Sequence, residues 1–444
     1  MMGRFVWVVG LLRVNTMIFK TLEIKNFRCF EALQLELSER FTLLIGDNGS
    51  GKTAILDAFA TLIEDHLITN SGITTGNRLS KNTNSRYALD NLGQAIIKEK
   101  VGDTLLRAEY LDNNSKYKTI STYELPNKNI LIIKEDLIYN DQIYGLSKGL
   151  LPVISYYGTD RLWQKTTDYF DTLPPEVRII GYEDCLQSAS NFNRFFRWFK
   201  TQEIAVLQKK EKRHALEAVR KAIINMVPDA KHVYWEVDYD EIMIETENAT
   251  NPPTPFHLLS DGYRNLIGVA ADIAYRMATL NPQLGEDVIK ETGGIVLIDE
   301  IDLHLHPKWQ REVVGRLLKT FPKVQFVASS HSPFIIQSLY HRDDVLLWDL
   351  EKAAPVEIES ESIEDIAEDQ QHVPIPQRTK RYSDMLNAAE AYYQKLHNFN
   401  GETNEELLDL KAELDKLSIP FSDDPAFVAQ LKFERDTLLA SKGK

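Results

Sequence analysis

A glycine-rich loop at residues 46–53 constrains the fold of this chain more than any other segment. It reads Gly-Asp-Asn-Gly-Ser-Gly-Lys-Thr, which matches the pattern G-x-x-x-x-G-K-[ST], in which backbone amides face the phosphates of a nucleotide. An apolar run at 41–45 predicts a buried strand before the loop, and residues 54–64 predict a helix after it. A glycine-rich turn without a ligand is the alternative, but the order of strand, loop and helix favours phosphate binding.

The side chains of this loop predict ATP and Mg²⁺ as cofactors. Lys52 would reach the β- and γ-phosphates as a point charge, and the Thr53 hydroxyl would take one coordination position of Mg²⁺. The N-terminus of the helix that follows favours an anion. The loop residues predicted to bind the nucleotide are Gly46, Asn48, Gly49, Ser50, Gly51, Lys52 and Thr53.

Two carboxylates, Asp299 and Glu300, follow a second apolar run at 295–298, which suits a central parallel strand. Mg²⁺ would explain Asp299, as a direct or water-mediated ligand, and Glu300 is placed to polarise the attacking water as a general base. An acidic pair after a strand also often caps a helix. The continuation Ile-Asp-Leu-His-Leu-His-Pro at 301–307 favours the catalytic interpretation, with Asp302 in a loop that contacts a second subunit.

Three histidines near these carboxylates have different interpretations. His304 and His306 lie close together, but no cysteine or third histidine stands at ligand spacing, so we predict no metal site there. His331 follows another apolar run, at 324–328, and ligands of open α/β sheets bind at the carboxyl ends of the strands. We therefore interpret His331 as a catalytic sensor of the γ-phosphate, with capping of the next helix as the alternative.

The segment Leu-Ser-Asp-Gly-Tyr-Arg at 259–264 indicates the class of nucleotide-binding protein. With the other motifs it makes the chain resemble the ABC-type ATPases of the SMC/RecF/OLD group, and among them the PtuA-type ATPases of bacterial Septu and retron-associated antiphage systems. The segments that carry the resemblance are 19–30, 46–53, 152–163, 259–264, 295–307 and 329–333. It implies an α/β fold, in which an ABC-type P-loop ATPase head at 17–350 has a mixed sheet, an antiparallel lobe and a short helical insertion at about 181–230.

The resemblance also implies roles for residues outside the loop. Two ATP molecules would lie between two heads, so Ser260 and Gly262 would contact the γ-phosphate bound by a second copy of the chain. Ser260 would in addition cap the helix that begins next to it and so direct the positive helix end at phosphate. Arg28 matches a position that contacts phosphate or base. Gln164 is the nearest candidate for the Q-loop glutamine, which helps to hold the metal.

The function implied by the resemblance is that of a dimeric ATPase that regulates a separately encoded HNH nuclease, of the PtuB type, in antiphage defence. A RecF-like DNA-repair ATPase that clamps DNA is the alternative. A transporter subunit is disfavoured, because transporter signatures read Leu-Ser-Gly-Gly-Gln. No nuclease domain is predicted within this chain, since no glutamate on a strand followed by an Asp-x-Asp strand end occurs after residue 350.

The charge of the chain limits how it could contact nucleic acid. Its formal net charge of −14 disfavours nonspecific DNA binding over the whole surface, so any contact with DNA, or with retron RNA or DNA, should be local. A basic cluster at 209–221 is either a solvated helix face or such a patch. Aromatic residues near the start of the helical insertion form either a packing core or a base-stacking platform. They are Phe192, Phe195, Phe196, Trp198 and Phe199.

The two ends of the chain are predicted to lie outside the ATPase head. Residues 1–16 read as an extension upstream of a working start at Met17, and their apolar run at 5–12 lacks the cleavage site of a signal peptide. Residues 351–444 combine an acidic linker with helical patterns, which would dock a partner or pack on the head as a lid. The sequence has only two cysteines and no apolar run of about 18 residues. We therefore predict a cytoplasmic protein without a membrane partner.

Overall fold

The computed structural model describes most of the predicted head and part of the C-terminal region. The described residues are 18–71, 87–89, 95–97, 104–111, 117–124, 131–134, 149–161, 178–187, 192–247, 252–358, 362–369, 371, eight positions between 385 and 395, and 405–418. The predicted extension at 1–16 and Gln164 therefore lie outside the described residues. The chain divides into two compact units, Met1–Ile366 and Ala367–Lys444.

The main sheet of the first unit has six strands in the order β16-β15-β3-β14-β13-β9. All neighbours pair in parallel except the edge strand β16, so the sheet is mixed. The strands are β3 (Phe41–Ile45), β9 (Val153–Tyr157), β13 (Gly294–Ile298), β14 (Val324–Ser329), β15 (Val345–Asp349) and β16 (Ala354–Val356). Every residue of β3, β9, β13 and β14 is buried, which explains why these strands read as apolar runs in the sequence.

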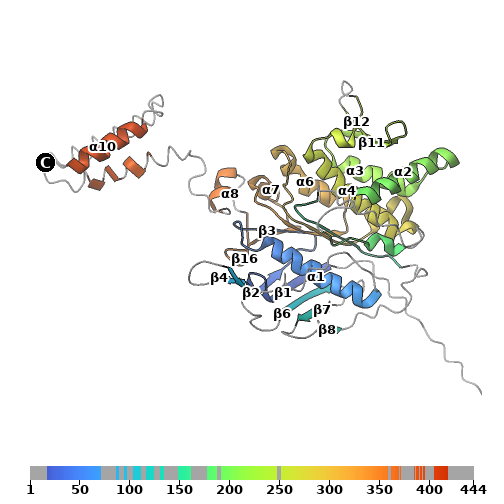
Figure 1. Cartoon of the computed structure of the whole chain (residues 1–444), viewed down its shortest axis with the longest axis horizontal. Helices are drawn as coiled ribbons and strands as arrows, with labels where there is room; N and C mark the ends of the chain where they lie inside the picture. The colour runs from blue at the N-terminus through green and yellow to red at the C-terminus, as the bar shows by residue number, and fades with distance from the viewer. Residues whose placement is uncertain are drawn as a thin grey trace, which may run out of the picture. The chain divides into compact units, whose positions relative to one another are not determined.

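Helix α1 (Lys52–Ser71) lies between the main sheet and a second, antiparallel sheet, as Figure 1 shows. The second sheet has the order β2-β1-β6-β7-β8 and forms the predicted antiparallel lobe. Its strands are β1 (Ile18–Phe27), β2 (Phe30–Glu36), β6 (Thr104–Leu111), β7 (Tyr117–Glu124) and β8 (Leu131–Lys134). Phe19 of β1 packs edge-on against Phe59 of α1, with 5.6 Å between ring centroids. The helix continues to Ser71, past the predicted end at residue 64.

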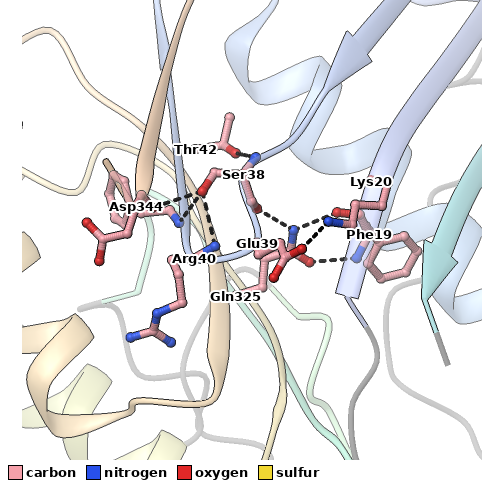
Figure 2. Close-up of polar contacts among 9 residues, drawn as sticks. Phe19, Lys20, Ser38, Glu39, Arg40, Thr42, Gln325 and Asp344 are labelled. Atoms are coloured by element: carbon pink, nitrogen blue, oxygen red, sulfur yellow. Dashed lines mark hydrogen bonds and ion pairs between the residues drawn. The ribbon is translucent and has the colours of Figure 1, made fainter. Parts of the chain in front are cut away.

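A buried glutamine on β14 joins the two sheets (Figure 2). The side chain of Gln325 is fully buried, and its amide oxygen accepts a hydrogen bond from the Phe19 N–H at 2.8 Å. Its amide nitrogen donates to the carbonyl oxygens of Phe19 and Ser38, each at 2.7 Å. Because each of these bonds lies inside the protein, losing the amide would leave buried backbone groups of β1 and of the β2–β3 turn without partners.

Helices cover the other face of the main sheet, where α3, α4 and α6 lie together (Figure 1). The predicted helical insertion contains α2 (Phe192–Lys209) and α3 (His214–Met226). Phe195 and Phe199 of α2 are buried 5.6 Å apart between ring centroids, so both of these aromatic residues belong to the packing core. The other helices of this part are α4 (Asp261–Leu280), α5 (Val288–Glu291), α6 (Pro307–Thr320) and α7 (Pro333–Gln337).

Shorter elements complete the described chain. A three-stranded sheet consists of β10 (Ala230–Glu236), β11 (Glu241–Thr246) and β12 (Thr254–Pro255), and a two-stranded one of β4 (Tyr87–Leu89) and β5 (Ala95–Ile97). Turns of 3₁₀ helix occur at Arg178–Tyr182, Phe256–Leu258 and Pro282–Asp287. After the main sheet come α8 (Ile363–Asp369) and, in the second unit, α10 (Glu405–Ser418). None of the helices in the described part of the chain has the length and apolar character needed to cross a membrane.

Candidate nucleotide-binding site

The loop at 46–53 connects the carboxyl end of β3 to the start of α1, in the order that the sequence predicts. Gly51 has a φ of 102°, which residues with a side chain rarely adopt. A Cβ atom at this position would lie 2.4 Å from the Phe30 ring and 2.7 Å from the Cys29 sulfur. The loop therefore packs closely on the turn between β1 and β2, and only glycine fits there.

The Lys52 side chain folds back across this loop. Its Nζ atom donates to the carbonyl oxygens of Gly46 and Asp47, at 2.8 and 2.9 Å. Burial lowers the pKa of the Lys52 ammonium, and the nearby carboxylates of Asp299 and Glu300 act in the opposite direction. A positive charge held inside a loop of this shape is suited to bind phosphate oxygens.

Asp299 connects the loop to the ends of two strands. The Thr53 hydroxyl donates to Asp299 Oδ2 at 2.7 Å, and the Ser329 hydroxyl donates to Asp299 Oδ1 at 2.5 Å. The Thr53–Asp299 distance is close to the separation of about 2.9 Å between adjacent oxygens around an octahedral Mg²⁺ ion with bonds of about 2.1 Å. Among the described residues no group of three His, Cys, Asp or Glu could hold a metal. A Mg²⁺ ion at Asp299 would therefore need hydroxyl, water and phosphate oxygens, which Mg²⁺ commonly uses.

Glu300 has an unusual backbone that is fixed from two sides. Its φ is 47°, in the left-handed region that few residues other than glycine adopt. Its N–H donates to the Ser329 hydroxyl at 2.8 Å, and its carbonyl oxygen accepts from Arg161 at 2.8 Å. A strained conformation that neighbouring groups hold in place is typical of functional sites. The direction of the Glu300 side chain is thus set by contacts of its own backbone.

Arg161 is the residue that the motifs did not identify as important. Its side chain is only 2% exposed and donates to the carbonyl oxygens of Gly158 and Asp299 at 2.9 and 2.7 Å, besides that of Glu300. Burial lowers its pKa to about 10, although Asp299, Glu300 and Asp302 oppose the shift. The available signal was its position just after the apolar run of β9, at the sheet edge where ligands bind.

Asn265 of α4 completes this connection. Its Oδ1 accepts from Arg161 Nε at 2.6 Å, and its Nδ2 donates to the Leu303 carbonyl at 2.7 Å. Gly262, one turn earlier, lies so close to the same loop that a Cβ atom would be 2.7 Å from the His304 carbonyl oxygen. The first turn of α4 is therefore fixed to the segment that follows Glu300.

Ser260 occupies the N-cap position of α4, as predicted, but the predicted capping bond is wrong. Within the described structure its hydroxyl makes no hydrogen bond to the first turn of the helix. The residue is exposed, and the neighbouring Asp261 forms an ion pair with Arg264 one turn later. The Ser260 and Asp261 side chains are thus placed at the surface, where a ligand from another molecule can contact them.

The turn that carries His331 is built by serines. Ser330 donates to Asp302 Oδ1 at 2.5 Å, and the Ser332 N–H donates to Ser330 Oγ at 2.9 Å. Ser332 also accepts from the Phe334 N–H at 3.1 Å and so caps α7, which excludes the alternative that His331 is the cap. His331 is exposed directly after the carboxyl end of β14. His306 caps α6 by accepting from the Lys308 N–H at 3.2 Å.

Arg28 lies at the other side of the loop, in the turn between β1 and β2. Its guanidinium forms an ion pair with Asp57 of α1, and the Tyr156 hydroxyl donates to the same carboxylate at 3.1 Å. Burial raises the pKa of Asp57, and Arg28 opposes this shift. In this structure Arg28 therefore attaches the turn to the helix that begins with Lys52 and Thr53.

Comparison with known proteins gives the family. Residues 41–337 match the family described as "AAA domain, putative AbiEii toxin, Type IV TA system". The chain belongs to this family. The matched residues include β3, the loop at 46–53, the start of α4 and the carboxylates after β13, whereas Arg28 lies before the matched residues.

Relatives agree with this assignment. The "Retron Vc95 probable ATPase" of Vibrio cholerae serotype O1 biovar El Tor is 25% identical over 379 residues, covering 72% of this chain and 71% of the relative. The "Retron Ec83 probable ATPase" of Escherichia coli is 25% identical over 480 residues, covering 89% and 86%. The "Septu protein PtuA" of Bacillus mycoides is 27% identical over 341 residues, which are 74% of this chain but 40% of that protein. The predicted resemblance to ABC-type and PtuA-like ATPases is confirmed.

Proposed function

We propose that this chain is a Mg²⁺-dependent ATPase that acts as a dimer and regulates a separately encoded HNH nuclease in antiphage defence. The network in which Thr53 and Ser329 hold Asp299 carries the ATPase part of the proposal. The family match and the relatives named as retron ATPases and Septu PtuA support the defence part.

In the proposed site the triphosphate binds along the loop at 46–53, with Lys52 on its β- and γ-phosphates. Thr53 and Asp299 would hold Mg²⁺, which supplies charge neutralisation of the phosphates when bound. The donors that face the γ-phosphate are then Lys52, the loop amides and His331. Gln164 would add a further metal ligand and Arg28 a phosphate or base contact.

Hydrolysis requires a water molecule aligned with the γ-phosphorus. Glu300 accepts a proton from this water. The water oxygen forms a bond to the γ-phosphorus, and the bond between the γ-phosphorus and the ADP oxygen breaks. Arg161 does not touch the nucleotide in this scheme. It acts as a positioning residue, because it holds the carbonyls of both Asp299 and Glu300.

The exposed Ser260 hydroxyl and the start of α4 support the proposed dimer. We propose that these groups bind the γ-phosphate of a nucleotide held by the loop of a second copy, with Gly262 allowing close approach and Asp302 lining the interface. Leu258, which is 66% exposed next to this turn, would be covered in the same contact. Each of the two sites would then be composed of both chains.

A mixing experiment tests composite sites directly. Lys52→Ala removes the charge of the loop, and Ser260→Arg blocks the exposed turn, so each variant alone should be inactive. In an equal mixture, half of the dimers contain one chain of each kind and have one intact site, so about one quarter of the wild-type rate should return. If the mixture stays as inactive as its components, the site does not form between chains.

The proposed partner contact lies in the predicted C-terminal region, residues 351–444, beyond β16, which belongs to the main sheet. We propose that its helices, which include α10, dock the nuclease. A chain that ends at residue 371 should hydrolyse ATP normally but fail to co-purify with the co-expressed nuclease. Retained nuclease binding together with an altered rate of hydrolysis would instead indicate a lid on the head.

A further inference from the structure

A cavity of about 480 Å³, apart from the candidate nucleotide-binding site, opens on the helical side of the head between α2, α3 and the end of α4. Among the described residues that line it there are four arginines and no acidic residue. The arginines are Arg178, Arg194, Arg197 and Arg213, and the aromatic residues Trp198 and Tyr275 also line the cavity. The chain as a whole has more acidic than basic residues, with a net charge of −14. Its average composition therefore does not explain four arginines in one cavity without an acidic residue.

Two arginines of this cavity are held by neighbouring groups. Arg194 forms ion pairs with Glu183 and Asp184, at 3.0 and 3.7 Å. Arg178 donates to the carbonyls of Leu280 and Gly149 at 2.6 and 2.7 Å. Burial lowers the pKa of Arg178, so an anion beside this guanidinium would stabilise its charged form.

Arg213 supplies a second positive group. It stands at the N-cap position of α3 and is half-buried at the cavity wall. Within the described parts of the chain, its guanidinium has no hydrogen-bond or ion-pair partner. Guanidinium groups bind phosphate oxygens with two parallel hydrogen bonds, which makes an arginine-lined wall suited to a phosphate group.

The remaining wall is aromatic and apolar. Trp198 is half-buried, lines the cavity and packs edge-on against Tyr275, with 5.4 Å between ring centroids. Ile180, Ala215 and Ala278 add apolar surface. Inorganic phosphate would use only the arginines, whereas a planar base attached to a phosphate would also stack on tryptophan.

The cavity is separate from the site around Lys52 and from the exposed turn at Ser260. Tyr275, Ala278 and Thr279 lie 15 to 19 residues after Ser260 on the same helix. At about 1.5 Å per residue, they are roughly 22–28 Å from the exposed turn along the helix axis. One rigid helix thus carries the end proposed to contact ATP and, near its other end, a wall of this cavity.

We propose that this cavity binds a nucleotide, with its phosphate against Arg178 and Arg213 and its base on Trp198. The volume is within the range of about 300–1,000 Å³ that is common for small-molecule sites. Two sources share this chemistry: a free mononucleotide, and the 5′-phosphorylated end of a single strand of nucleic acid. The inference goes beyond ATP hydrolysis and does not depend on it.

Equilibrium dialysis on the full-length chain tests the proposal, with saturating Mg²⁺ and ATPγS to block the first site. The probes are radiolabelled thymidine monophosphate and the dinucleotide pdTpdT. Arg213→Glu and Trp198→Leu should each weaken binding about tenfold or more. The matched control is Lys221→Glu, which makes the same charge reversal on α3 at an exposed residue outside the cavity. Circular dichroism and thermal unfolding show whether each variant is folded, and Arg213→Gln serves if charge reversal destabilises the chain.

The outcomes separate the possibilities. Binding of both probes supports a free-nucleotide site, and binding of pdTpdT alone supports recognition of a strand end. The proposal is overturned if neither probe binds, or if Arg213→Glu and Trp198→Leu bind as the control does. It is also overturned if equimolar inorganic phosphate displaces the probes, because the site would then be an anion site without base recognition.

Discussion

The two parts of the proposed ATP site differ in how much one chain completes. Asp299 is 3% exposed, and both of its carboxylate oxygens accept hydrogen bonds from residues of the same chain. Ser260 is exposed, and its hydroxyl makes no capping bond in the described structure. The groups around Asp299 are thus preorganised by folding, whereas Ser260 is positioned by folding but remains accessible to another molecule. Four substitutions test this difference, from the largest expected effect to the smallest.

Glu300→Gln, in the part of the site next to Asp299, should have the largest effect on the rate of ATP hydrolysis. We expect the rate of ATP hydrolysis to fall by about 100-fold or more, because glutamine cannot accept the proton of the attacking water. ATP binding should remain, and light scattering should show ATP-bound dimers. The measurements are phosphate release and nucleotide binding on the same sample. Normal hydrolysis by this variant would show that Glu300 is not the base.

Arg161→Met should lower the free energy of unfolding by about 3 kcal/mol, since it leaves buried carbonyl oxygens without donors. Urea unfolding followed by fluorescence measures this change. Arg161→Lys should recover part of the stability but less of the hydrolysis rate, because one ammonium cannot hold the Asp299 and Glu300 carbonyls in the same geometry. Equal recovery of both quantities would argue for a purely structural role.

Gly262→Ala should cost about 2 kcal/mol of unfolding free energy, because the new methyl group would overlap the His304 carbonyl. Thermal unfolding measures the loss, and Gly315→Ala is a useful comparison because Gly315 also lies in a helix, α6. The nearest atom to a Cβ there is Arg342 Nη1 at 3.8 Å, so the control has no steric overlap. Equal losses would contradict the close packing between α4 and the loop after Glu300.

Ser260→Ala should have the smallest effect on stability, below about 0.5 kcal/mol, because no capping bond is lost. An N-cap serine that bonds its helix would cost about 1 kcal/mol. The same variant should slow hydrolysis if the hydroxyl contacts nucleotide in a second chain. A stability loss of the ordinary size would show that Ser260 caps its own helix in solution.

Local patterns predicted the elements that are buried on both sides. Strands β3, β13 and β14 read as apolar runs because helices or a second sheet cover both faces. The end of α1 was predicted too early, although Gly72 follows the last helical residue and is a common stop signal. Of the aromatic residues near the start of α2, Phe195 and Phe199 belong to the core, whereas Trp198 lines the cavity.

The sequence by itself determined the glycine-rich loop, the acidic pair after an apolar run and the resemblance to ABC-type ATPases, because these rest on motifs of a few consecutive residues each. Only the tertiary structure decided that Arg161 holds the backbone of residues 138 and 139 positions away. It also placed Ser329 on Asp299 through the pairing of β13 with β14, and gathered four arginines around Trp198. Such groups share no local pattern. They meet because burying a polar side chain is favourable only where the fold supplies its partners.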